Sequence, residues 1–226
     1  MKICILAVTK AAFNEYCIAG MTDEGKWIRP IPSFGNSRFW THTQLTCQVN
    51  GFLRVGDVLE FDGQVPTTFQ HPNHTEDFLV SSERMTLHQR FTNEELMNFL
   101  HSKVEGEQEF SETIYAQGRS LCLIKVDHFQ HRITQWEDDP RKPKMTFSHE
   151  NFTVTNPHTV AGDYIVKDCK WAPIVLNRQV SNLDSYTDLY LVIGLATKNN
   201  FNGKEYPQVV GLHTKPLVKS LETYPN

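Results

Sequence analysis

Cationic and aromatic side chains occur together at two places in the chain, one in each half. The two sets are Lys10, Trp27 and Arg29 in the first half, and Lys170, Trp171 and Lys198 in the second. A guanidinium binds phosphate through paired hydrogen bonds, and an indole stacks on a nucleobase. The sequence therefore predicts two ligand-binding faces. The alternative is that both tryptophans belong to hydrophobic cores and that the arginine is an edge-strand charge.

The polar segment of residues 70–77 has the composition of a weak metal site. It contains His71, His74, Glu76 and Asp77, and imidazole and carboxylate groups are suitable ligands for transition metals. The spacing matches no specific metal motif such as H-E-x-x-H. We expect no tightly bound metal and no other cofactor, and we interpret the segment as a polar surface loop.

A second charged segment, residues 136–144, places Glu137, Asp138 and Asp139 just before a basic cluster. Such carboxylates could hold Mg²⁺ in a nuclease, although adjacent opposite charges are also typical of a solvated turn. An alternative function is that of a metal-dependent hydrolase or nuclease, which would use either the loop from His71 to Asp77 or the Asp138 region. The chain has neither a Walker A loop nor a G-x-G-x-x-G fingerprint, which argues against a P-loop ATPase or a Rossmann oxidoreductase.

The charge balance argues against unspecific coating of nucleic acid. The net charge is −4, and residues 1–110 carry 9 Lys and Arg against 14 Asp and Glu, a net of −5. Proteins that bind polyanions without sequence preference have a basic excess. The five cysteines include no C-x-x-C pair, which indicates reduced thiols in a cytoplasmic protein. No apolar run reaches the roughly 20 residues that span a bilayer, so we expect no membrane association.

Most of the chain has the pattern of short β-strands. We expect strands near residues 2–10, 14–22, 27–31, 55–61, 78–87, 120–127, 132–136, 144–149, 152–155, 164–166, 188–196 and 207–213. Pro30 and Pro32 should end the third strand, and residues 33–55 have no recognisable pattern. Short strands at this spacing, separated by turn residues, are typical of sandwiches and barrels.

One helix is predicted, over residues 92–104. Thr92 and Glu95 form a capping box, and Leu96, Phe99 and Leu100 fall on one face. The acidic, glycine-containing stretch that follows predicts a domain boundary within residues 105–118. The domains would be residues 1–110 and 111–226.

A short repeat suggests duplication of a hairpin. Thr9-Lys10-Ala11-Ala12-Phe13-Asn14 is echoed by Thr197-Lys198-Asn199-Asn200-Phe201-Asn202, each between apolar runs. The two halves are thus predicted to carry equivalent hairpins.

Six short segments resemble the dual OB-containing domain family of prokaryotic proteins. They are Val8-Thr9-Lys10, Cys17-Ile18-Ala19-Gly20, Trp27-Ile28-Arg29-Pro30, Val55-Gly56-Asp57, Leu191-Val192-Ile193-Gly194-Leu195 and Gln208-Val209-Val210-Gly211. The resemblance implies two OB-like barrels and a nucleic-acid or nucleotide-binding role near mobile-element and phage-defence systems. It implies no catalytic residue.

The expected protein is therefore mostly β, with two OB-like β-barrels in tandem and one flanking helix. The expected function is non-catalytic binding of single-stranded nucleic acid or a nucleotide, as an accessory component of a larger system. OB barrels stack bases on aromatic side chains and follow the backbone with a cationic groove. Besides the hydrolase, a second alternative is a protein-interaction module, which the low basicity favours.

Overall fold

The computed structural model describes residues 1–12, 14–35, 37–47, 51–132, 144–153, 156–159, 162–171, 186–198 and 202–215. The chain forms two compact units, Met1–Phe99 and Leu100–Asn226. The division falls upstream of the expected boundary within residues 105–118. The reason is that the acidic stretch is bonded to the second unit: the backbone N–H of Glu105 donates to the carbonyl oxygen of Leu123 at 2.8 Å.

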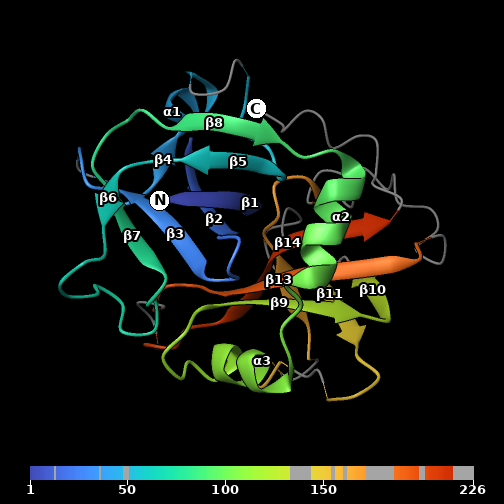
Figure 1. Cartoon of the computed structure of the whole chain (residues 1–226). Coiled ribbons are helices and arrows are strands. Elements are labelled where there is room, and N and C mark those ends of the chain that lie inside the picture. The colour runs from blue at the N-terminus through green and yellow to red at the C-terminus, as the bar shows by residue number, and fades with distance from the viewer. Residues whose placement is uncertain are drawn as a thin grey trace. The chain divides into compact units, whose positions relative to one another are not determined.

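The first unit is a curled, mostly antiparallel sheet (Figure 1). Its strands are β1 (Lys2–Ala12), β2 (Glu15–Met21), β3 (Trp27–Pro32), β4 (Trp40–Thr41), β5 (Asp57–Glu60), β6 (Gly63–Gln64), β7 (Asp77–Val80) and β8 (Thr86–Arg90). The order is β6-β7-β3-β2-β1-β5-β8, with β4 paired to β2. Among the described strands of this unit, β3 and β7 are the pair that runs parallel.

The strand order identifies the first unit as an OB-like barrel. Only two residues, Phe61 and Asp62, separate β5 from β6, so these two strands act as one bent strand that pairs with β1 at one end and with β7 at the other. Counted this way, the sheet has five principal strands. The first neighbours the second and the fourth, and the third pairs in parallel with the fifth, as in the Greek-key barrel of the OB fold.

The second unit repeats this order. Its strands are β9 (Leu121–Val126), β10 (His128–Arg132), β11 (Lys144–Ser148), β12 (Tyr164–Val166), β13 (Asp188–Leu195) and β14 (Pro207–Lys215), in the order β10-β11-β12-β14-β13-β9. Asp127 alone separates β9 from β10, so they too form one bent first strand. The third and fifth strands, β12 and β14, again pair in parallel. The prediction of a mostly β protein with two OB-like barrels is confirmed.

The two echoed hairpins are not equivalent in this topology. The first echo joins β1 to β2, the first and second strands of its barrel, whereas the second joins β13 to β14, the fourth and fifth. The prediction of equivalent hairpins is therefore wrong. The two similar segments connect neighbouring antiparallel strands in both barrels, but they connect different strands of the barrel. Residues 13 and 199–201 of the two connections lie outside the described residues.

The prolines of β3 do not end the strand. The backbone N–H groups of Arg29 and Ser33 donate to Glu76 and Val80 at 2.7 and 3.0 Å. Successive strand residues point to alternate sides, so the nitrogens of Pro30 and Pro32 face away from β7. A proline is tolerated where no ladder bond is needed, and the strand extends to Pro32.

The predicted helix is confirmed as α2 (Asn93–Ser102). Its capping box is present: the Thr92 N–H donates to Glu95 Oε2 at 2.7 Å, and the Glu95 N–H donates to Thr92 Oγ1 at 3.2 Å. The expected strand over residues 78–87 is interrupted, since β7 ends at Val80 and β8 begins at Thr86.

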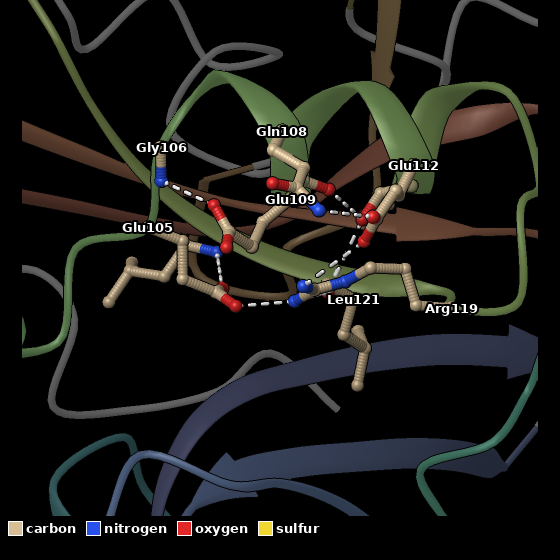
Figure 2. Close-up of polar contacts among 9 residues, drawn as sticks. Glu105, Gly106, Gln108, Glu109, Glu112, Arg119 and Leu121 are labelled. Carbon is tan, nitrogen blue, oxygen red and sulfur yellow. Dashed lines mark hydrogen bonds and ion pairs between the residues drawn. The ribbon is translucent and has the colours of Figure 1, made fainter.

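Two helices were not predicted, α1 (His42–Cys47) and α3 (Glu107–Ile114). Helix α3 buries Phe110, Thr113 and Ile114 against β9 and β13. Figure 2 shows how its start is held. Arg119 pairs with Glu105, whose other carboxylate oxygen accepts the Leu123 N–H at 2.7 Å. The acidic stretch is thus an anchored helix start and not a linker.

Candidate ligand-binding site in the first unit

The parallel pairing of β3 and β7 brings together two segments that the sequence separates by almost fifty residues. Arg29 lies opposite Asp77 in the ladder, and its Nη1 donates to Asp77 Oδ1 at 2.8 Å. The other carboxylate oxygen accepts from Arg38 Nη2 at 3.2 Å. One buried aspartate therefore holds two guanidinium groups in place.

Two histidines lie beside this triad. They belong to the connection between β6 and β7, which joins the fourth and fifth barrel strands. The His74 N–H donates to the His71 carbonyl oxygen at 2.9 Å, and the Asp77 N–H donates to the His74 carbonyl oxygen at 3.2 Å. This turn places the two imidazole rings with their centroids 5.0 Å apart. We call Arg29, Arg38, His71, His74 and Asp77 the arginine–histidine cluster.

Burial and charge determine the protonation of the cluster. Burial, followed by the positive charges of Arg29 and Arg38 and by His71, lowers the pKa of His74 to about 2. His74 is therefore neutral at any physiological pH. Burial also raises the pKa of Asp77, an effect that the two arginines oppose.

His74 is the most unusual member of the cluster. Only 3% of its surface is exposed, and neither Nδ1 nor Nε2 has a hydrogen-bond partner among the described residues. A neutral imidazole has one donor and one acceptor nitrogen. Buried polar atoms without partners are rare in folded proteins and need an explanation.

Arg38 is the more exposed of the two guanidinium groups in the cluster. The exposed fraction of its side chain is 17%, against 6% for Arg29 and 4% for Asp77. Arg38 Nη1 also lies 3.5 Å from Oε1 of the exposed Gln70. Arg38 and Gln70 are therefore more accessible to solvent than Arg29, Asp77 and His74.

The weak metal candidates are only partly brought together. Asp77 is committed to two arginines, whose positive charges disfavour a cation beside it. Over the part of the chain that the structure describes, no three His, Cys, Asp or Glu side chains are grouped to hold a metal ion. The Asp138 region lies outside the described residues.

The predicted first face does not form as expected. Trp27 pairs with Met21, which lies opposite Cys4, whereas Lys10 pairs with Tyr16 at the other end of the β1–β2 hairpin. Six residues of β1 span about 20 Å, so Lys10 and Trp27 do not share a rim. Trp27 is 5% exposed, which makes it a core residue.

The predicted second face is also divided. Trp171 is fully buried, and its Nε1 donates to the Leu212 carbonyl oxygen at 2.9 Å. The buried Lys170 Nζ bonds Asp168 Oδ2 at 2.8 Å. Trp171 thus joins its segment to β14, and Lys170 pairs with Asp168, whose Oδ2 also accepts the Leu212 N–H at 2.7 Å. Lys198 is exposed in the connection that follows β13.

Sequence reasoning missed Arg38 and the proximity of Arg29 to the histidine loop. Arg38 lies within residues 33–55, which have no periodic pattern. The type of its side chain was the one feature that could have indicated a role in binding. No local pattern could, because its partner Asp77 is 39 residues away.

The model of the dual OB-containing domain matches residues 1–212. The chain belongs to this family. No curated protein and no solved structure was found to match it. Among the helices of the described residues, none is long and apolar enough to cross a membrane.

Proposed function

We propose that this dual OB-containing protein is a non-catalytic binding protein for a nucleotide or single-stranded nucleic acid, with the arginine–histidine cluster as its site. The observation that carries the proposal is the buried Arg29–Asp77–Arg38 triad, which lies beside His74. Arg29 lies on the third strand of the first barrel, Asp77 begins the fifth, and His74 belongs to the connection between the fourth and fifth. OB folds take oligonucleotides on their second and third strands and on the loop between the fourth and fifth.

A nucleotide is better supported than a long strand. Proteins that bind single strands offer several exposed aromatic rings on which successive bases stack. Among the large apolar and aromatic side chains of the described residues, Tyr115 is the one exposed ring. The acidic balance of residues 1–110 also opposes a long polyanion. A compact ligand with one or a few phosphates avoids both difficulties.

Arg38 is the group that would hold the phosphate. Its guanidinium is partly exposed, and a guanidinium suits the paired oxygens of a phosphate. Arg29 is buried and bonded to Asp77, so its part is to position that carboxylate, which in turn orients Arg38.

Calorimetric titration with nucleoside mono-, di- and triphosphates and with short single-stranded oligonucleotides tests the proposal. Arg38→Ala should weaken binding at least tenfold, since a hydrogen bond to a charged group contributes about 1.5–3 kcal/mol. The matched control is Arg84→Ala, which removes an exposed arginine of the same unit. If the wild type binds none of these ligands, or if both variants bind as it does, the proposal is wrong.

Three earlier expectations stay predictions: the cytoplasmic location, the accessory role in a larger, defence-related system, and a protein partner. No observation among the described residues favours the hydrolase or the interaction module over a binding site at the cluster.

A further inference from the structure

The two ring nitrogens of the buried His74 make no hydrogen bond with the described residues around them. The side chain lies 97% buried, and both nitrogens lack a hydrogen-bond partner among the residues described. Leaving a buried donor and acceptor unpaired destabilises a fold, whereas an apolar side chain of the same shape would not. Proteins keep such local conflicts mainly at functional sites.

We propose that His74 recognises the uncharged base of the ligand, with one ring nitrogen accepting a hydrogen bond from the base and the other donating one to it. This inference rests on the proposed function and adds a second role to the site. Arg38 would hold the phosphate at the accessible edge, and His74 would select the group that enters beyond it.

The charges around His74 favour an uncharged partner. Arg29 and Arg38 act on His74 with two positive charges. These charges are offset by the Asp77 carboxylate, which bonds both arginines, and by Glu76, which acts on Arg29. A buried phosphate would add unbalanced negative charge beside these carboxylates, and a buried unpaired charge is strongly unfavourable. A base carries hydrogen-bond donors and acceptors without net charge.

The state of the imidazole fits this role. Because burial and the neighbouring arginines keep its pKa far below neutrality, His74 offers one N–H and one lone pair over the whole physiological pH range. A site built to bond a polar group rejects an analogue that lacks this group, because its own polar atoms then stay unpaired.

The test compares nucleoside monophosphates with ribose 5-phosphate, which lacks the base. Wild type should bind the best monophosphate at least tenfold more tightly than ribose 5-phosphate. In His74→Phe this preference should fall to within about twofold, with ribose 5-phosphate affinity little changed. The control is His88→Phe, at an exposed position of β8, which should keep the preference.

A second measurement separates recognition from a structural role. Without ligand, His74→Phe should unfold at a higher urea concentration than wild type, because it removes two unpaired polar atoms. A lower midpoint would mean that His74 has buried partners that stabilise the fold, and would overturn the inference.

The binding outcomes are distinct. If His74→Phe keeps the wild-type preference for the monophosphate, the inference is wrong while the proposed function stands. If wild type binds neither ligand and no other nucleotide, both fail together.

Discussion

The pH dependence of stability offers a direct test of the environment of His74. In the unfolded chain its pKa is near the ordinary value of 6.5, and in the folded protein it is lowered to about 2, chiefly by burial. Because the pKa is lower in the folded state, the contribution of the neutral ring to stability is fully present above pH 6.5. The contribution is lost as the pH falls below it, because only the unfolded state then takes up the proton.

The size of the effect follows from these two values. Each pH unit below 6.5 costs the folded state about 1.4 kcal/mol. Between pH 7 and pH 5 the single histidine should therefore lower the free energy of unfolding by about 2 kcal/mol. With a urea dependence of about 2 kcal/mol per M, the midpoint moves by about 1 M.

The experiment is urea denaturation of wild type and His74→Phe at pH 7 and at pH 5. Other groups titrate over this range, but they do so in both proteins, so the difference between the two isolates His74. The free energy of wild type minus that of the variant should fall by about 2 kcal/mol on acidification. The control is His128→Phe, at an exposed position of β10, which should follow wild type. An equal pH dependence of wild type and His74→Phe would refute the assignment of a buried, neutral imidazole.

Three further predictions concern stability. Asp77→Asn removes the carboxylate shared by two buried or half-buried arginines. The free energy of unfolding measured with urea should fall by about 3–5 kcal/mol. The control Asp62→Asn, at an exposed position, should show no measurable loss. Thr92→Ala removes the acceptor of the Glu95 N–H at the start of α2. It should lower the free energy of unfolding, measured by chemical denaturation, by about 1 kcal/mol, and a loss below about 0.3 kcal/mol would contradict this prediction. Trp27→Ala opens the core of the first barrel and should cost about 3–5 kcal/mol in a thermal melt, whereas a stable variant with weakened nucleotide binding would restore Trp27 as a ligand contact.

Local signals were sufficient for much of the secondary structure. The capping box of Thr92 and Glu95 predicted where α2 begins, because its bonds join residues three positions apart. The strand at residues 164–166 was predicted with the bounds observed, and that at 188–196 to within one residue. Helix α3 had a local signal too, since Phe110, Thr113 and Ile114 repeat at helical spacing. It was missed because the acidic stretch was interpreted as a linker.

The candidate site depended on contacts that no local pattern contains. The sequence supplied Arg29 as a possible phosphate ligand and, separately, the polar loop that contains His74 and Asp77. Only the parallel pairing of β3 with β7 placed the arginine opposite the aspartate. Such a pairing joins strands that are distant in the chain, and its register is set by the packing of the whole barrel.

The burial of the same side chains was likewise decided by tertiary structure. From the sequence alone, an indole near an arginine can be interpreted as a surface on which a base stacks or as a core residue. The strand pattern allows both interpretations. Trp27 is a core residue because its strand, β3, pairs with β2 on one side and with β7 on the other, and the side chain is buried. The sequence determined by itself the residue types, the strands and the helix cap, since these depend on neighbours along the chain. Only the fold decided which charges meet and which rings are buried, because both depend on long-range strand pairing.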